Sequence, residues 1–400
     1  MPSSLAAAQQ TVVLGIERLL GPDRRLVEGR RIGIVCNPAS IDGSLRLSVD
    51  RLVEDQDLTV AAIFGPQHGF RSDLQDNMIE TPHTVDARRR VPVFSLYSET
   101  REPTAEMLRE IDVMVVDLQD VGTRVYTYVY TMANCMRAAA RHGIPVVVCD
   151  RPNPIGGTEE DVEGPRLQDG FTSFVGQFPV PLRHGMTIGE LARLFNDAFG
   201  LGARLDVVPL DGWRRSMYHD ETGLPWVMPS PNIPTLETAV VYPGAVLFEG
   251  TMVSEGRGTT RPFELTGAPW IDDDRLAAAL NARGLPGAYF RAVVFEPTFH
   301  KHARQPCGGC QVHVLDRRAF RPVRTAVELI AEYRRQNPAR YGWKEPPYEY
   351  EHDRQPIDLL YGSDRLRTTL DRGGDVAPLL ASWAAEEDAF RRLREKYLLY

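Results

Sequence analysis

The 400-residue chain has few cysteines and no long apolar run. Its five cysteines are an odd number, and only Cys307 and Cys310 are close in sequence, so they do not form the disulfide framework of a small secreted protein. No apolar run approaches the roughly 20 residues that a bilayer-spanning helix needs. The N-terminus also lacks the basic segment and long apolar core of a secretory signal. We therefore expect a cytoplasmic protein with no membrane partner, or a secreted or periplasmic one only if a leader was removed.

The chain also lacks an excess of positive charge. It has 46 lysines and arginines against 54 aspartates and glutamates, which gives a net charge of -8 and a pI near 5.7. This balance argues against nucleic acid or an anionic membrane surface as the partner. The hydrophobic content of 43% and the charged content of 25% are ordinary for a soluble globular protein. The composition suits a soluble enzyme and makes no prediction about the oligomeric state.

Several motifs that indicate a cofactor or a common hydrolase are missing. The glycine-rich segment Ser254–Thr260 is not a Walker loop, because no Gly-Lys-Ser/Thr follows it, and it is not a Gly-x-Gly-x-x-Gly turn that opens a helix. The chain contains no His-Glu-x-x-His and no Gly-x-Ser-x-Gly. Cys307 and Cys310 have the spacing of a zinc or redox pair, but no second pair exists, so a hairpin turn is the better interpretation. We therefore expect no cofactor and no metal.

The chain does contain a repeated pattern of short apolar runs that end in polar side chains. Four such runs occur in the first 155 residues: Arg31–Cys36, Leu58–Phe64, Val113–Val116 and Ile144–Cys149. The polar residues that follow them are, in order, Asn37; Gln67 and His68; Asp117; and Asp150, Arg151 and Asn153. Between the runs, Thr104–Glu110 and Tyr130–His142 are predicted helices. This alternation predicts an α/β fold with a doubly wound parallel sheet, whose strand ends would gather the polar residues at one edge as an active site.

The length of the chain favours two domains. The first domain, residues 1–265, would hold the parallel sheet, a further strand at Leu205–Leu210, and a helix that begins at a capping box of Thr187 and Glu190. Within it, Trp226–Gly267 has five prolines and five glycines in 42 residues. That content excludes long regular elements and predicts an ordered, functional loop system.

The second domain, residues 266–400, is predicted to be a smaller α+β unit that closes a cleft against the first. Its predicted elements are a helix at Asp272–Arg283, strands near Tyr289–Glu296 and Gln311–Leu315, a helix at Thr325–Asn337, and two C-terminal helices after a loop rich in proline and aromatic residues. Ligands often bind at the seam between two domains, so we expect the site near this cleft.

Two of the strand-end loops carry candidate catalytic groups. In Gly65–Arg71, His68 and Arg71 are assigned to a substrate, and the alternative is a histidine that only completes a turn. In the segment that follows Val116, Asp117 and Asp120 form a carboxylate pair that Arg124 could orient. Two carboxylates in different environments can divide the acid and base roles. The alternative is a structural Asp–Arg pair that caps the next helix.

Two further loops carry candidate binding groups. Asn153 lies between two prolines, and a fixed amide at a strand end could read sugar hydroxyls or an acetamido group; the alternative is a rigid turn. Glu255 and Arg257 lie among glycines, an arrangement that suits a substrate with a carboxylate; the alternative is a surface loop with a solvated ion pair. The same stretch also carries Asn232, Tyr242 and Glu249.

Long motifs in one order give the chain a resemblance to a known family. They include GPQHGFR, DLQDVGTRVYTYVYT, DRPNPIGG, SFVGQFPVPLRHGMTIGELA, PSPNIPTLETAVVYPGAVLFEGT, SEGRGTTRPFELTGAPW and CGGCQVHV. Through these motifs, which run over nearly the whole chain, it resembles the bacterial exo-β-N-acetylmuramidases of the NamZ type. The resemblance implies a Rossmann-like first domain with a smaller C-terminal domain. It also implies release of N-acetylmuramic acid from the non-reducing ends of peptidoglycan fragments.

That substrate carries a lactyl carboxylate and an acetamido group. The resemblance makes Arg71, Arg124 and Arg257 the candidates for the carboxylate, and Tyr126 and Asn153 the candidates for the acetamido group. The remaining residues that we assign to substrate binding are Gln67, Asp117, His184 and Asn232.

One departure from the family concerns residue 67. Many relatives carry glutamate within Pro-Glu-His-Gly, whereas this chain has Gln67, which cannot donate a proton as a general acid. We hypothesise that Glu255 or Asp120 supplies the acid, with His68 also catalytic and Gln67 orienting the substrate. The alternatives are a non-catalytic protein that binds saccharides containing muramic acid, and a hydrolase of another acidic sugar on the same fold.

Overall fold

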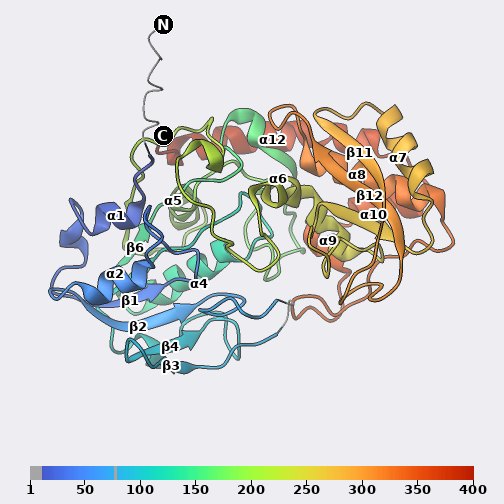
Figure 1. Ribbon diagram of the computed structural model, residues 1–400. Coiled ribbons are helices and arrows are strands. Elements are labelled where there is room, and N and C mark those ends of the chain that lie inside the picture. Colours follow the sequence, from blue (N-terminus) through green and yellow to red (C-terminus); the bar gives the residue numbers. More distant parts are fainter. Residues whose placement is uncertain (1–10, 76–78) are drawn as a thin grey trace, which may run out of the picture.

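A seven-stranded sheet forms the centre of the N-terminal half of the molecule (Figure 1). The structure is a computed structural model that describes residues 11–75 and 79–400. The strands are β1 (Arg31–Val35), β2 (Thr59–Gly65), β3 (Thr84–Asp86), β4 (Val91–Ser95), β5 (Val113–Val116), β6 (Val146–Cys149) and β9 (Leu205–Val208). Their order is β3-β4-β2-β1-β5-β6-β9, and only β3 is antiparallel to its neighbour. The six parallel strands have the Rossmann order, which reverses direction between β1 and β5, the expected place for a ligand.

Helices cover both faces of this sheet, as the alternating pattern predicted. They are α1 (Gly15–Leu19), α2 (Ser48–Glu54), α3 (Ala105–Leu108), α4 (Tyr128–Arg141) and α5 (Ile188–Ala198). On β5, Met114 and Val116 belong to one buried core, and Val113 and Val115 belong to the other. Successive strand side chains point to opposite faces, so a strand buried on both sides reads as a continuous apolar run. We call residues 31–208, from β1 to β9, the sheet unit.

Local signals also placed the start of α5 correctly. The Thr187 hydroxyl accepts a hydrogen bond from the backbone N–H of Glu190 at 3.3 Å, and the Glu190 carboxylate accepts one from the Thr187 N–H at 3.0 Å. The predicted capping box is therefore confirmed.

The prediction that the stretch from Trp226 to Gly267 holds no long regular element is wrong. Helix α6 (Leu236–Ala245) and the 3-10 helix η4 (Val246–Gly250) follow each other there. Pro243 lies near the end of α6, where only the last turn is affected. A Cβ on Gly244 would come within 1.9 Å of the Pro322 carbonyl oxygen, so glycine here serves close helix packing rather than a turn.

A second, antiparallel sheet lies at the other end of the molecule (Figure 1). Its order is β10 (Leu265–Ala268), β12 (Cys307–Val314), β11 (Ala288–Phe295), and helices α7 (Asp273–Ala282) and α8 (Pro322–Gln336) pack beside it. We call residues 265–336 the three-stranded unit. Cys307 and Cys310 lie in β12, so the predicted hairpin turn is wrong; the glycines between them allow close approach, since a Cβ on Gly309 would meet the Thr266 carbonyl oxygen at 1.9 Å. Both thiols are free and buried.

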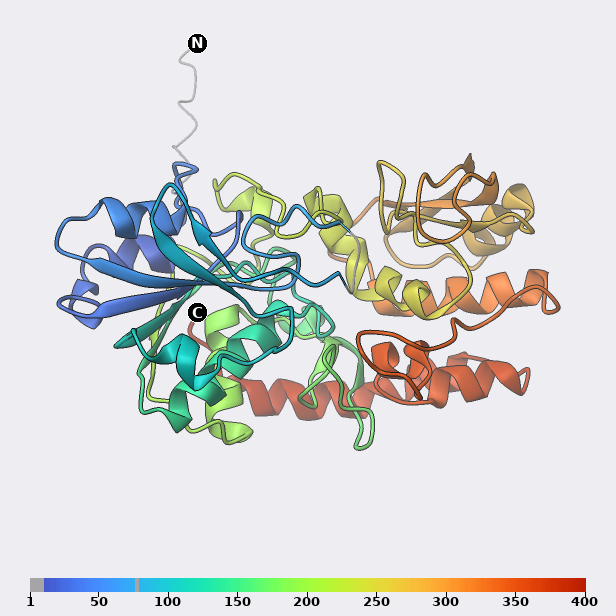
Figure 2. The ribbon, with the colours of Figure 1, turned by 90° about the horizontal axis from the view of Figure 1, so that it is seen from below.

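The end of the chain is more helical than predicted and returns to the sheet unit. Four helices occur where two were expected: α9 (Pro356–Tyr361), α10 (Arg365–Asp371), α11 (Ala377–Ala381) and α12 (Trp383–Arg394). In Figure 2, α12 runs from the three-stranded side of the molecule to a place beneath the sheet unit. It packs on the small sheet of β7 (Glu163–Arg166) and β8 (Pro181–Arg183). Short 3-10 helices complete the fold at η1 (Arg24–Leu26), η2 (Glu159–Asp161), η3 (His219–Glu221) and η5 (Glu395–Tyr397).

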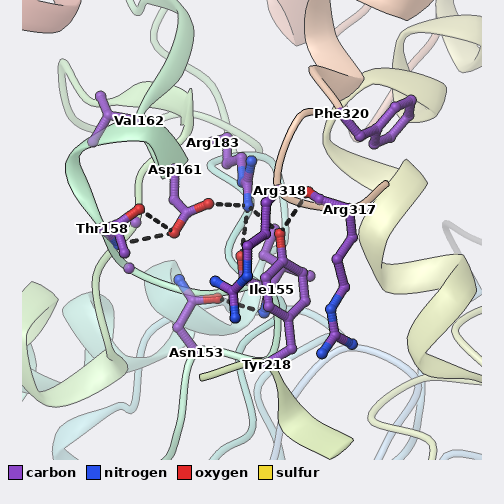
Figure 3. Close-up of polar contacts among 12 residues, drawn as sticks. Asn153, Ile155, Thr158, Asp161, Val162, Arg183, Tyr218, Arg317, Arg318 and Phe320 are labelled. Carbon is purple, nitrogen blue, oxygen red and sulfur yellow. Dashed lines mark hydrogen bonds and ion pairs between the residues drawn. The ribbon is translucent and has the colours of Figure 1, made fainter. Parts of the chain in front are cut away.

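A buried polar cluster fastens the two units together near β8 (Figure 3). The Arg183 guanidinium pairs with Asp161 at 2.5 Å and contacts the Tyr218 hydroxyl at 3.3 Å. That hydroxyl donates to the backbone carbonyl of Arg317 at 2.9 Å, and the Arg317 side chain lies over the Tyr218 ring. The loop between β12 and α8 is therefore bound to the sheet unit through Tyr218.

Within residues 11–75 and 79–400, no helix combines the length and apolar character needed to cross a membrane.

Candidate active site

A pocket lies beyond the carboxyl ends of β2 and β5. Its wall comes from three parts of the chain. The sheet unit supplies Gln67, His68 and residues 125–128; the segment that includes α6 and η4 supplies Asn232, Tyr242, Glu249, Arg257 and Phe263; and the loop before α9 supplies Tyr348 and Glu349. These parts meet only in the folded chain, at the strand edge where the sequence predicted a site.

The loop after β2 has the tight backbone that the sequence indicated. His68 adopts a φ of 68° and Gly69 a φ of 78°, both in the left-handed region. A Cβ on Gly65 would come within 2.7 Å of the Phe70 backbone nitrogen. The His68 Nδ1 lies 2.7 Å from the Leu74 carbonyl oxygen. This bend turns Gln67 and His68 into the pocket.

Gln67 joins three elements through its amide. Its Nε2 donates to the Tyr97 hydroxyl and to Glu349 Oε1, both at 3.2 Å, and its Oε1 accepts from the Thr127 hydroxyl at 2.6 Å. The Tyr97 hydroxyl in turn donates to Glu349 Oε2 at 2.7 Å. Residues after β2, after β4, before α4 and before α9 therefore form one buried network at the pocket wall.

A second buried network surrounds Glu249. Its Oε1 accepts from Arg257 Nη2, and its Oε2 accepts from the Tyr348 hydroxyl, each at 2.6 Å. The Arg257 guanidinium also lies over the Phe263 ring, 5.1 Å from its centroid. The bond to Glu249 is charge-assisted and short, so the arginine and the carboxylate hold each other in fixed positions.

The pocket holds a buried carboxyl, Glu349, and a buried guanidinium, Arg257, and burial affects the pKa of each. Burial raises the pKa of Glu349, and the neighbouring Glu249 raises it further against the lowering effects of Tyr97, Gln67 and Arg257. Burial alone would lower the pKa of Arg257, but Glu249 and Glu255 raise it overall, so the guanidinium stays charged. The pocket therefore combines a carboxyl that tends to keep its proton with a permanent positive charge.

Five of the residues predicted for the site line this pocket. They are Gln67, His68, Tyr126, Asn232 and Arg257.

Asp117 and Arg124 lie elsewhere and have structural partners. Asp117 is fully buried and pairs with Arg151 at 2.6 and 2.8 Å. The Arg124 guanidinium, also fully buried, donates to the backbone carbonyls of Pro165, Val180 and Leu360. An arginine occupied by three carbonyls inside the protein is not placed to bind a substrate carboxylate. The alternative weighed for this segment, an Asp–Arg structural pair, fits Asp117, although the partner is Arg151.

Asn153, His184 and Asp120 are likewise part of the internal structure. Asn153 Nδ2 donates to the Met186 carbonyl, and its Oδ1 accepts from the Ile155 N–H, as a rigid turn requires (Figure 3). The buried His184 Nε2 lies 3.2 Å from Asp120 Oδ2, which also accepts from the Gly122 N–H. These groups do not line the pocket.

Glu255 and Arg71 also lie outside the pocket. Glu255 is fully buried, with Lys301 Nζ at 2.6 Å, His300 Nδ1 at 3.2 Å and Arg257 Nε at 3.5 Å. Burial alone would raise the pKa of Glu255, but Lys301 and His300 lower it well below its usual range, so this carboxylate has no proton to donate as a general acid. Arg71 is exposed and lines a separate groove beside β3 and β4.

Comparison with known proteins assigns the family. Two family models match the chain: Exo-beta-N-acetylmuramidase NamZ, N-terminal, over residues 32–237, and Exo-beta-N-acetylmuramidase NamZ, C-terminal, over residues 240–400. A curated relative, the peptidoglycan beta-N-acetylmuramidase NamZ of Bacillus subtilis (strain 168), is 45% identical over 394 residues, which are 98% of this chain and 92% of the relative. The chain belongs to the NamZ family.

Two solved structures extend the comparison to the fold. Both are crystal structures of DUF1343 family proteins from Bacteroides fragilis NCTC 9343. One has a TM-score of 0.88 and 35% identity and covers 98% of this chain and 99% of its own. The other has a TM-score of 0.74 and 29% identity and covers 97% of this chain and 99% of its own. The NamZ fold therefore includes the sheet unit, the three-stranded unit and the C-terminal helices.

Sequence reasoning missed four groups of the two networks at this NamZ pocket: Tyr97, Glu249, Tyr348 and Glu349. Glu249 was noted among the polar residues of its stretch without a role. Tyr97 follows β4, a short strand that was not predicted. Tyr348 and Glu349 lie in the proline- and aromatic-rich loop before α9, and a carboxylate between tyrosines in such a loop was the signal that could have identified them.

Proposed function

We propose that this protein is an exo-β-N-acetylmuramidase, a glycoside hydrolase that releases N-acetylmuramic acid from the non-reducing ends of peptidoglycan fragments. Membership of the NamZ family and the name of the Bacillus subtilis relative support the reaction class. The observation that carries the proposal is the pair of pocket carboxylates, Glu249 and Glu349, in different environments. Most glycosidases use two carboxyl groups, one as an acid and one as a base or nucleophile.

The walls of the pocket support attack at a chain end. They come from both halves of the chain and surround the space from several sides, which suits a terminal sugar better than the middle of a strand. Tyr126 and Tyr242 supply ring faces and hydroxyls for a sugar. If the protein acts in the cytoplasm, as the sequence predicts, its substrates are wall fragments that are being recycled.

Of the arginines considered for the lactyl carboxylate, Arg257 is the one that lines the pocket. Its charge is fixed, and it is held in place by Glu249 and Phe263. We assign the lactyl carboxylate to Arg257, and the acetamido group to Tyr126 or Asn232. This assignment replaces Arg71, Arg124 and Asn153, which the structure places elsewhere.

A binding protein without catalysis is the second candidate, because the resemblance to the family implies glutamate at the position of Gln67. The two candidates differ in turnover. An aryl β-N-acetylmuraminide should release its chromophore, whereas the matching β-N-acetylglucosaminide, which lacks the lactyl group, should not.

Release from the muraminide alone supports the proposed hydrolase. Release from both sugars contradicts its specificity. Release from neither, together with calorimetric binding of N-acetylmuramic acid, supports the binding protein instead.

A further inference from the structure

We infer that Glu349 is the general acid of this site and that Gln67 is a positioning residue that holds the Glu349 carboxyl. This inference rests on the proposed hydrolase function. It replaces Glu255 and Asp120 as candidates for the acid, because neither of these residues lines the pocket.

The pocket wall offers two carboxyl groups, and one of them is ion-paired with an arginine. The oxygens of Glu249 accept hydrogen bonds of 2.6 Å from Arg257 and Tyr348. The two donors to Glu349, the Tyr97 hydroxyl and the Gln67 amide, are both uncharged. Glu249 is therefore suited to the other carboxylate role, as a base, nucleophile or stabiliser of positive charge.

Glu349 has the surroundings of an acid. Its partners, the Tyr97 hydroxyl and the Gln67 amide, are both neutral, and its amide contact is the longer at 3.2 Å. The groups that face it from neighbouring elements are Tyr97 after β4, Gln67 after β2, Glu249 in η4 and Arg257 in the loop after η4. The effect of burial is larger than the effect of any of these groups, and it raises the pKa of Glu349. A carboxyl with a raised pKa is suited to proton donation near neutral pH.

The backbone around Glu349 is strained in a way that supports a functional role. Glu349 has a φ of 44° and Tyr350 a φ of 69°, two successive left-handed conformations in residues other than glycine. Such conformations are unfavourable and are found preferentially at active sites. Here they turn the Glu349 side chain towards Gln67 and Tyr97, where it is buried against the pocket.

Gln67 fits beside Glu349 because it supplies a hydrogen. A glutamate at position 67 would place two carboxyl groups about as far apart as the present 3.2 Å contact, and such a pair must share a proton. The Gln67 amide provides an N–H in place of that proton. The Thr127 hydroxyl, which donates to Gln67 Oε1, fixes the amide so that its Nε2 faces Glu349. The proton needed for catalysis then belongs to Glu349 alone.

The reaction balances with this assignment. Glu349 donates its proton to the glycosidic oxygen, which leaves as an alcohol with the electron pair of the broken C–O bond. Water adds to the sugar carbon, and the proton that water releases restores the carboxyl of Glu349 over the cycle.

Glu349→Gln tests the acid, because the need for an acid depends on the leaving group. We expect kcat/KM for the disaccharide N-acetylmuramyl-N-acetylglucosamine to fall by about 10²–10⁴-fold. Turnover of the 2,4-dinitrophenyl muraminide, whose leaving group needs no proton, should stay within about tenfold of wild type. The basic limb of the pH profile should disappear, while calorimetric binding of N-acetylmuramic acid should be retained and show that the variant is folded.

Gln67→Leu tests the positioning role through the pH profile. The Gln67 hydrogen bond lowers the pKa of Glu349, so its removal should move the basic limb to higher pH. A purely structural role would lower activity without moving that limb, and Gln67→Glu should restore most of the activity through a shared proton.

Equal losses on the two leaving groups in Glu349→Gln, or no loss on the disaccharide, would overturn the inference while leaving the hydrolase proposal intact. A wild-type protein with no turnover of either muraminide would overturn the proposed function, and the inference with it.

Discussion

Residues that line the pocket also hold one another in place, so a substitution at one of them changes its neighbours as well. Arg257 shows this, because the same guanidinium that is assigned to the lactyl carboxylate also holds Glu249 at 2.6 Å. Removing such a partner leaves a buried charge without compensation, which typically costs about 3–5 kcal/mol of stability. A useful substitution therefore has to keep the charge.

Arg257→Lys keeps the charge but loses the planar fork that binds carboxylates with two parallel hydrogen bonds. We expect KM for an aryl muraminide to rise at least tenfold, which is about 1.4 kcal/mol of binding free energy. Calorimetric binding of N-acetylmuramic acid should weaken, and binding of N-acetylglucosamine, which has no lactyl group, should change little. If both sugars weaken equally, Arg257 only holds Glu249 and does not read the lactyl carboxylate.

Elements were predictable wherever local residues determine them. The ends of β1, β2, β5 and β6 were located because an apolar run buried on both faces stops at a polar residue, and α5 was located from its capping box. The prediction of a hairpin at Cys307 and Cys310 was wrong because the glycines between them allow neighbouring strands to pack closely. Helix α6 was not predicted for a similar reason. Pro243 and Gly244 are typical of helix ends, but Pro243 lies near the end of α6 and Gly244 allows close packing against Pro322.

The pocket itself could be predicted only in part. Gln67 and His68 directly follow a strand, so the sequence placed them at the sheet edge. Glu349 lies 282 positions from Gln67, and only tertiary folding brings the two together. No local pattern could show, either, that Arg124 would be occupied by backbone carbonyls while Arg257 would line the pocket.

Helix α8 begins with a cap from another element. Its own N-cap residue, Arg321, makes no side-chain cap, and the Glu163 carboxylate of β7 accepts from the Arg324 N–H at 2.8 Å instead. Burial raises the pKa of Glu163 to about 7, against the lowering effect of that N–H. A carboxyl whose pKa is higher in the folded state than its ordinary 4.5 contributes stability at low pH, and the contribution is lost as the pH rises from about 4.5 to 7.

Glu163→Gln should remove that pH dependence, because it keeps the acceptor for α8 without a titrating proton. We expect the wild-type free energy of unfolding to fall by about 1–3 kcal/mol more than that of the variant between pH 4.5 and 7. Urea unfolding at several pH values measures this. Parallel curves for the two proteins would show that Glu163 does not titrate in that range.

At the scale of the whole molecule, the C-terminal residues close the fold. The buried Arg394 donates to the backbone carbonyls of Gly185 at 2.6 Å and Thr158 at 2.9 Å. Beyond it, the backbone N–H of Leu399 donates to Glu190, and the Tyr400 hydroxyl donates to Asp150 at the end of β6. The sheet unit thus takes part of its structure from the last residues of the chain.

Arg394→Met should destabilise the protein, because it removes the hydrogen bonds that the buried guanidinium donates to Gly185 and Thr158. We expect a loss of about 2–4 kcal/mol in the free energy of unfolding, from two hydrogen bonds made by a charged group. Arg392→Met is the matched control: Arg392 is exposed two positions earlier on the same helix, and its substitution should change stability by less than about 0.5 kcal/mol. Equal effects of the two substitutions would contradict the role given to α12.

The return of α12 also sets the order of events during protein synthesis. Domains near the N-terminus usually fold while the ribosome is still working, at roughly 5–20 residues per second. Here Gly185, Glu190 and Asp150 receive one of their hydrogen bonds each from residues 394–400, in addition to those from nearer residues such as Arg215 and Thr187. These contacts of the sheet unit therefore form roughly 10–40 s after β9 has been synthesised, at the same synthesis rate. The contacts of the sheet unit are therefore complete only after residues 394–400 have been synthesised, and not when the last strand of the sheet is made.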